Sequence, residues 1–373
     1  MKIVNPFEDL FLSLKQQIVL NDSSLEMIES LAVSLGIEII KSDDGELYLS
    51  VDNCSTINKK MFTEKFPRVN ETFYLTVGTQ KGGVGKTTIS YQLGLLLSLL
   101  GYKTLFVDFD AQSNLTSLFN ETIEESEFSL YDYFCENKEI KDLITKINPS
   151  LSLLPANTNV GEINSILEES SRESEEELSG LKKHLSNTNN HFNSKLFVQF
   201  RKDLELAAND YDFVIFDTHP ETNFLNRLAL QVSNLCLVPM EPTKFSKSSL
   251  RKVVPEIRES LLISDTEYKD KNVRVLLNFT RPVKSLAEKE KKIKEMNRAF
   301  GKVLLENHIN FHYEITEATD MSYPVWAYPE TTVDAILDIK KIVFELLDFI
   351  SREHSKDVED QTSRGPRKRT LGW

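Results

Sequence analysis

The stretch Lys81-Gly82-Gly83-Val84-Gly85-Lys86-Thr87-Thr88 decides the fold of this 373-residue chain. It stands between an apolar segment, residues 73–77, and an amphipathic segment, residues 86–100. Glycines let backbone N–H groups turn inward around phosphate oxygens, and a following helix points its positive N-terminal end at the same anion. Lys86 supplies a cation for the β- and γ-phosphates, and the Thr87 hydroxyl is suited to coordinate Mg²⁺. The sequence therefore predicts a phosphate-binding loop between a strand and a helix.

The chain around this loop alternates between strand-like and helix-like segments from about residue 70 onward. Such alternation indicates a mostly parallel sheet with helices on both faces. We expect a last helix over residues 332–353, because its apolar residues recur at helical spacing. The predicted strands are residues 73–77, 104–109, 151–154, 213–216, 235–238 and 273–278.

The loop departs from the ordinary G-x-x-x-x-G-K-[ST] pattern at one position. Gln80 stands where the first glycine is expected, and a second lysine, Lys81, follows it. The resulting K-G-G-x-G-K-T string resembles the signature of the ParA/MinD group of P-loop ATPases, the deviant Walker A proteins. The resemblance covers roughly residues 72–350. It implies a doubly wound α/β sheet of the deviant Walker A P-loop NTPase type, with ATP and Mg²⁺ bound by Lys81 to Thr88.

Polar side chains at three further strand ends extend the resemblance. Thr104-Leu105-Phe106-Val107-Asp108-Phe109-Asp110-Ala111-Gln112 resembles the group's D-x-D-x-Q motif, which implies that Asp110 positions or activates the attacking water. Tyr211-Asp212-Phe213-Val214-Ile215-Phe216-Asp217 resembles a Walker B strand, which implies that Asp217 holds Mg²⁺ through water. Asn278 resembles the asparagine that reads the adenine edge, although an asparagine at a strand end is also a common turn residue.

The sequence departs from the partition-type pattern in two places, just after Asp110 and just after the Walker B strand. Ala111 stands where proline is usual, Ser113 where glycine is usual, and Thr218-His219-Pro220 follows the Walker B strand. Two interpretations of His219 stay open. It contacts the nucleotide or a partner, or it is a structural histidine.

The resemblance assigns Lys81 to a dimer. In this group the extra lysine reaches across a two-fold interface to the phosphates of the other subunit, so a homodimer forms on ATP binding. A cation at a water-poor interface stabilises the negative charge that develops in phosphoryl transfer. The implied catalytic residues are Lys81, Lys86 and Asp110, in a slow ATP hydrolase that a partner stimulates. Hydrolysis would then open the dimer.

The charge distribution gives evidence on the cargo that this ATPase would move. The chain carries 57 acidic and 44 basic residues, a formal net charge of −13, yet residues 281–302 hold eight basic residues against three acidic ones. Such a run is commonly a solvated helix face. We favour nonspecific DNA contact in the ATP state, through Lys289, Lys292 and Arg298. The chain ends in Arg364-Gly365-Pro366-Arg367-Lys368-Arg369. Gly and Pro disfavour the amphipathic helix with which some members of the group bind membranes, so we expect no membrane binding.

The expected function is therefore a dimerising ATPase that segregates or positions DNA, in plasmid or chromosome partition. A DNA-binding or cargo adaptor protein would stimulate it, in the cytoplasm and at the nucleoid. The alternative is a ParA-like ATPase that positions a protein cargo or acts in another non-partition complex. The iron–sulfur branch of the group is excluded, because Cys54, Cys135 and Cys236 match no cluster-binding motif.

We expect the chain to consist of three parts. Residues 1–66 form an N-terminal α+β extension, with helices at residues 7–20 and 25–35 and a hairpin at residues 37–51. This extension is either a winged-helix module or a dimer or adaptor module. Residues 67–353 form the ATPase domain, with an acidic insertion at about 161–197 that is either a solvated helix or a disordered loop. Residues 354–373 form a flexible basic tail.

Overall fold

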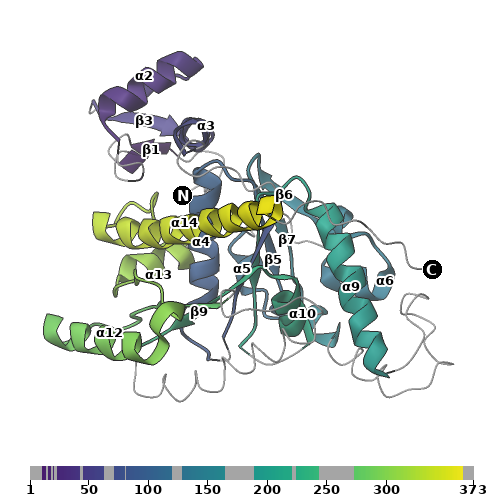
Figure 1. The fold of residues 1–373 in the computed structure, drawn as a ribbon. Coiled ribbons are helices and arrows are strands. Elements are labelled where there is room, and N and C mark those ends of the chain that lie inside the picture. The colour runs from purple at the N-terminus through teal and green to yellow at the C-terminus, as the bar shows by residue number, and fades with distance from the viewer. Residues whose placement is uncertain are drawn as a thin grey trace.

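A seven-stranded sheet forms the centre of the computed structural model, in the order β10-β9-β4-β8-β5-β7-β6 (Figure 1). Neighbouring strands are parallel except β6, which pairs antiparallel with β7 at one edge. The mostly parallel α/β fold predicted from the sequence is thus confirmed, and edge strand β6 is an addition to it. The strands are β4 (Phe73–Val77), β5 (Thr104–Asp108), β6 (Thr145–Asn148), β7 (Leu151–Leu154), β8 (Phe213–Asp217), β9 (Leu235–Met240) and β10 (Val273–Leu277).

The structure describes the chain with several gaps, and all statements below concern the described part. The described residues are 11–13, 16–17, 20, 23–42, 45–62, 71–79, 81–119, 128–163, 189–220, 224–242 and 273–363.

Helices cover both faces of the sheet, as Figure 1 shows. Alternate residues of one strand face opposite cores: Leu75 packs in the core that contains α4 and α14, and Tyr74 packs in the core that contains α9 and α10. This alternation of side chains is the geometric basis of a doubly wound sheet. The helices are α4 (Lys86–Leu99), α5 (Asn114–Ser117), α6 (Leu130–Glu136), α7 (Ile140–Leu143), α9 (Asn189–Ala207), α10 (Phe224–Val232), α12 (Leu286–Phe300), α13 (Tyr313–Asp320) and α14 (Val333–Ser363), with a 3₁₀ turn η2 (Gly301–Val303).

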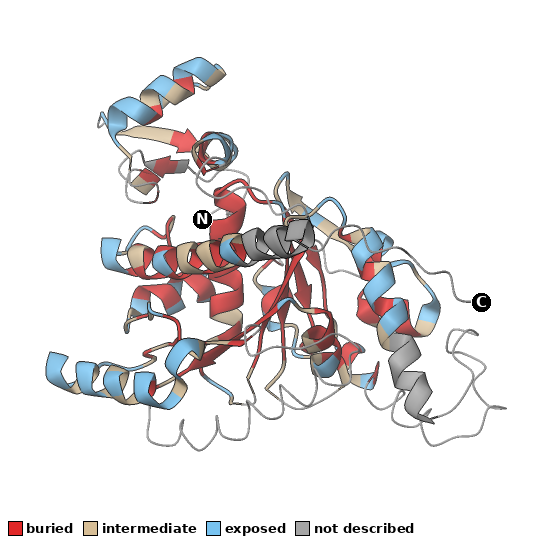
Figure 2. Ribbon diagram, viewed as in Figure 1, coloured by how far each residue is buried: buried red, intermediate tan, exposed pale blue. Residues whose placement is uncertain are grey.

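Helix α4 packs directly on the sheet and is buried along nearly its whole length (Figure 2). Gly94 makes this close packing possible, since a Cβ atom there would lie 2.2 Å from the ring of Phe106 on β5. Helix α4 therefore holds the loop that precedes it in a fixed position against the strands.

The N-terminal extension forms a small α+β unit. Strands β1 (Phe11–Ser13), β3 (Leu47–Ser50) and β2 (Ile40–Lys41) pair antiparallel in that order, with helices α2 (Leu25–Leu35) and α3 (Val51–Phe62). The predicted helix over residues 25–35 and the pairing of the two hairpin strands are confirmed. The predicted helix over residues 7–20 is wrong in part, because residues 11–13 pair with β3 and only residues 16, 17 and 20 are helical in its described part.

This N-terminal unit contacts the end of α4 that lies away from the phosphate loop (Figure 1). The Asn58 amide donates to the Leu99 carbonyl at 2.8 Å, and the Ser55 hydroxyl donates to the Ser98 carbonyl at 3.2 Å. Carbonyls in the last turn of a helix lack partners within the helix. Helix α3 therefore supplies a donor to the Leu99 carbonyl and a second donor to the Ser98 carbonyl, which also accepts from the Gly101 N–H.

Helix α14 ends later than the sequence predicts, and parts of two expected segments lie outside the described residues. Helix α14 continues to Ser363, ten residues beyond the expected end at Glu353, so the first half of the expected flexible tail is helical. Residues 164–188 of the acidic insertion and residues 364–373 lie outside the described residues. In the described part of the chain, no helix combines the length and hydropathy needed to span a bilayer.

Candidate nucleotide-binding site

The glycine-rich loop joins β4 to the first turn of α4. Gly83 and Gly85 have φ angles of +69° and +85°, in the left-handed region that side chains other than glycine avoid. Gly85 is the N-cap of α4, and no side chain caps that helix end. The N–H groups of the first turn thus point toward the loop, in the arrangement that binds phosphate at a helix N-terminus.

Lys86 begins α4 and has only 8% of its surface exposed. Burial lowers its pKa, and the nearby carboxylates of Asp217 and Asp110 act in the opposite direction. The two carboxylates favour the charged form of Lys86, which is the form that binds phosphate oxygens.

Asp217 lies at the carboxyl end of β8 and is fully buried. Its carboxylate accepts hydrogen bonds from the hydroxyls of Thr87, at 2.7 Å, and Ser90, at 2.9 Å. Burial raises the pKa of Asp217 to about 6, against the effect of these two bonds. Hydroxyl and carboxylate oxygens are the hard ligands that Mg²⁺ prefers, so Thr87 and Asp217 fit a magnesium ion directly or through water.

Ser90 is a residue of this site that the sequence motifs did not single out. It lies three positions after Thr87 on α4, and residues at that spacing share a helix face. The spacing is the signal in the sequence that could have identified it.

The two aspartates of the D-x-D segment have different surroundings. Asp108 is fully buried and accepts from the Thr116 N–H and hydroxyl at 2.8 and 2.7 Å, and from the Asp110 N–H at 3.0 Å. Burial, and then the charge of Asp217, raises the pKa of Asp108 to about 7. Asp108 therefore fixes the turn between β5 and α5. Thr116 is a second residue of this site that the sequence motifs did not identify.

Asp110 lies in that turn, with 5% of its surface exposed. Its carboxylate accepts from the Gln112 N–H at 2.8 Å and lies 3.4 Å from the Asn114 amide nitrogen. The Nε2 atom of His219 is 3.9 Å from the same carboxylate. His219 therefore lies beside the predicted catalytic aspartate, at the carboxyl edge of the sheet.

Lys81 begins the loop motif, with 41% of its side chain exposed. Its ammonium is 3.7 Å from the carboxylate of Glu241, which follows β9, and the Arg281 guanidinium is 4.0 Å from that carboxylate. Lys81 and Arg281 thus share one carboxylate that is only 19% exposed, while the Lys81 side chain is partly open to solvent.

Asn278 follows β10 and contacts the loop itself. Its side-chain amide donates to the Val84 carbonyl at 3.0 Å. The structure thus brings Asn278 to the phosphate loop, and whether it reads adenine stays a prediction.

The predicted DNA-contacting residues lie on α12, apart from the nucleotide site. Helix α12 is mostly exposed (Figure 2), and its only buried residue is Met296. Lys292 forms an ion pair with Glu288 at 3.1 Å, and Lys289 contacts Asn310. Arg298 is exposed, whereas Lys289 and Lys292 are partly buried, so Arg298 is the most accessible of the three predicted residues.

A parallel α/β sheet, a glycine loop before a buried helix, and carboxylates at the next strand ends define a P-loop nucleotide-binding domain of the deviant Walker A type. The family model described as an AAA domain, AAA_31, matches residues 73–269. The chain belongs to this family and is a ParA-like P-loop ATPase.

Comparisons with individual proteins agree with this family. The virulence plasmid ParA family protein pGP5-D of Chlamydia trachomatis is 27% identical over 288 residues, which cover 76% of this chain and 97% of that protein. The ATP complex of McdA from Cyanothece is similar in fold, with a TM-score of 0.57 and 20% identity over 74% of this chain and 97% of that one.

Cobyrinic acid a,c-diamide synthase from Mycobacterium smegmatis, solved with an ATP analog and magnesium, has a TM-score of 0.55 and 18% identity over 74% of this chain and 94% of that one. Likeness at such identity establishes the fold alone.

Proposed function

We propose that this chain is a nucleotide switch that dimerises on binding ATP, binds DNA nonspecifically as a dimer, and separates after slow hydrolysis. The position of Lys81 is the observation that carries the proposal. Its side chain is 41% exposed and its ammonium lies 3.7 Å from the Glu241 carboxylate, whereas Lys86 at the start of α4 is only 8% exposed. A cation in that place can serve a nucleotide bound to a second subunit.

The residues of one subunit divide the work on ATP. The loop N–H groups and Lys86 bind the phosphates, and Thr87 and Asp217 would hold Mg²⁺, which neutralises charge on the β- and γ-phosphates. Asp110 would orient the attacking water, because its carboxylate is buried next to Lys86 and is fixed by the Gln112 N–H. Lys81 from the second subunit would stabilise the charge that develops on the phosphoryl group.

DNA contact would use the exposed basic side chains of α12. A chain with a formal charge of −13 is repelled by a duplex at long range, so a single basic helix binds weakly. Two copies of α12 in one dimer would bind much more tightly through effective concentration. Similarity to a virulence plasmid ParA family protein supports plasmid partition as the setting, with an adaptor protein that stimulates hydrolysis.

A DNA titration with ATP, ADP or no nucleotide at several salt concentrations tests this function. We expect binding only with ATP, little sequence preference, and a steep loss of affinity with salt. The variant Lys289→Ala/Lys292→Ala/Arg298→Ala should lose binding. A matched variant, Lys60→Ala/Lys141→Ala/Lys202→Ala, changes the net charge equally at exposed positions away from α12 and should retain binding.

Two other results would redirect the proposal. Binding that ignores both nucleotide and the α12 variant would place the DNA site elsewhere in the chain. No binding under any condition would favour the protein-cargo alternative.

A further inference from the structure

Asn278 connects the end of β10 to the phosphate loop. Its backbone N–H donates to the Met240 carbonyl at 2.8 Å, which fixes its main chain beside β9. Its side-chain Nδ2 donates to the Val84 carbonyl at 3.0 Å. The residue therefore links two strands of the sheet to the backbone of the loop.

The same amide also packs against the last glycine of the loop. A Cβ atom built on Gly85 would lie 2.7 Å from the Asn278 Nδ2 atom, closer than real contacts allow. Gly85 has a φ of +85°, so a side chain there would also strain the backbone. Gly85 and Asn278 are thus fitted to one another, the glycine leaving the space that the amide occupies.

A carbonyl within an anion-binding loop needs a donor. A phosphate-binding loop works because its N–H groups face the anion, and a carbonyl that rotates inward would instead repel the phosphate oxygens. A hydrogen bond that holds the carbonyl costs nothing when the ligand arrives, because the donor is already in place.

We propose that Asn278 is a positioning residue for the phosphate loop, and that its amide fixes the Val84 carbonyl so that the loop N–H groups stay turned toward the phosphates. This role rests on the proposed function of the loop in binding phosphate. It is additional to the base contact expected from the sequence. The Asn278 amide has two N–H donors and one carbonyl acceptor, so the bond to Val84 leaves one donor and the acceptor for an adenine edge.

A ligand without a base separates the two roles. We suggest calorimetric titration of inorganic tripolyphosphate with Mg²⁺ into the wild type, Asn278→Ala and Asn278→Leu. Both variants remove the donor, and leucine retains most of the volume beside Gly85. We expect both to bind tripolyphosphate about tenfold more weakly, the effect of about one hydrogen bond.

Asn307→Ala is the matched control. Its side chain donates to the Glu345 carboxylate of α14 at 2.8 Å. This variant should bind tripolyphosphate as the wild type does. Thermal unfolding of each variant, measured in parallel, should show that the Asn278 variants are folded at the titration temperature.

Three outcomes would overturn the proposal. Unchanged tripolyphosphate affinity with weakened ATP affinity would make Asn278 a base-reading residue only. An equal loss in Asn307→Ala would make the effect a general loss of stability. If the wild type bound neither tripolyphosphate nor ATP, the phosphate-loop function would fail first, and the role of Asn278 with it.

Discussion

The hydroxyl of Thr87 donates a hydrogen bond of 2.7 Å to the carboxylate of Asp217, so the phosphate loop is tied to the end of β8. Ser90, one turn further along α4, donates to the other oxygen of the same carboxylate. These bonds hold two oxygen ligands of the kind that Mg²⁺ prefers in one place. They explain why the two motifs, 130 residues apart in the chain, act as one site.

Asp217→Asn should remove the magnesium dependence of ATP binding. An amide retains the size of the side chain but loses the charge that attracts the ion. We expect wild-type affinity for ATP to fall when EDTA replaces Mg²⁺, and the variant to bind ATP weakly and equally in both conditions. Asp212→Asn, at the residue that precedes the opposite end of the same strand, is the control. An Asp217→Asn protein with full magnesium dependence would remove Asp217 from the metal site.

The parts of the site that a local motif encodes could be predicted from the sequence, and the parts that depend on packing between distant segments could not. The loop, Asp110 and Asp217 follow from short strings of residues at strand ends. The contact of Asn278 with Val84 joins residues 194 positions apart, and no local pattern encodes it. Helix α3 was missed because its start, Val51, continues the alternating pattern of β3, although Val51, Cys54, Ile57 and Met61 recur at helical spacing.

Asn58→Ala should lower the free energy of unfolding by about 1 to 3 kcal/mol, because it leaves buried partners without a hydrogen bond. Asn58 is fully buried and bonds to Leu99 and Gln17. Urea unfolding measures the loss. Asn53→Ala, on the more exposed side of the same helix, should change stability by less than about 0.5 kcal/mol. Equal effects of the two substitutions would contradict a specific role for Asn58 in docking the N-terminal unit.

The contribution of Asp108 to stability without nucleotide should fall as the pH rises from about 4 to about 7. The pKa of Asp108 is raised from 3.8 to about 7 in the folded protein. Between these values the folded state holds a proton that the unfolded state releases, so raising the pH favours unfolding. Asp108→Asn should make the slope of unfolding free energy against pH more positive, and Asp142→Asn, an exposed control, should not. An unchanged slope in Asp108→Asn would contradict this assignment.

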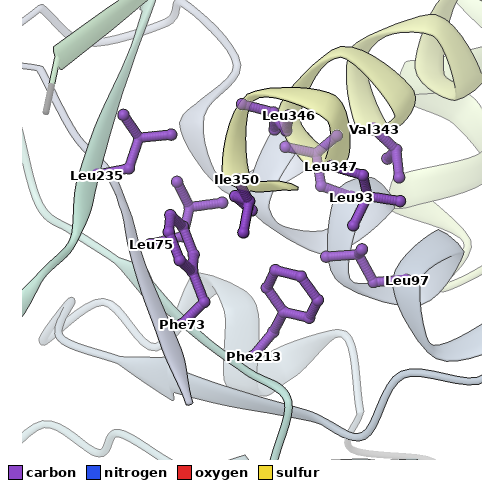
Figure 3. A pocket seen from close by; sticks show the side chains of 10 residues that line it. All are labelled: Phe73, Leu75, Leu93, Leu97, Phe213, Leu235, Val343, Leu346, Leu347 and Ile350. Atoms are coloured by element: carbon purple, nitrogen blue, oxygen red, sulfur yellow. The ribbon is translucent and has the colours of Figure 1, made fainter. Parts of the chain in front are cut away.

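A small apolar hollow lies between the starts of β4, β8 and β9 and the helices α4 and α14 (Figure 3). Leu93 and Val343 both line it. Leu93→Ala would enlarge the hollow and should cost about 2 to 5 kcal/mol, whereas Val343→Ile adds one methylene and should add up to about 0.8 kcal/mol. Chemical denaturation compares the two. A marked loss of stability in Val343→Ile would mean that no space is available there.

The mass of the Asp110→Ala protein in solution, measured by light scattering with Mg²⁺ and either ATP or ADP, tests the nucleotide switch most directly. This variant should bind ATP but not hydrolyse it, so the dimer should persist. We expect the mass of two chains with ATP and of one chain with ADP, and the mass of one chain in both when Lys81→Ala is added. A single-chain mass for Asp110→Ala with ATP, under conditions where ATP binding is measured, would contradict the switch.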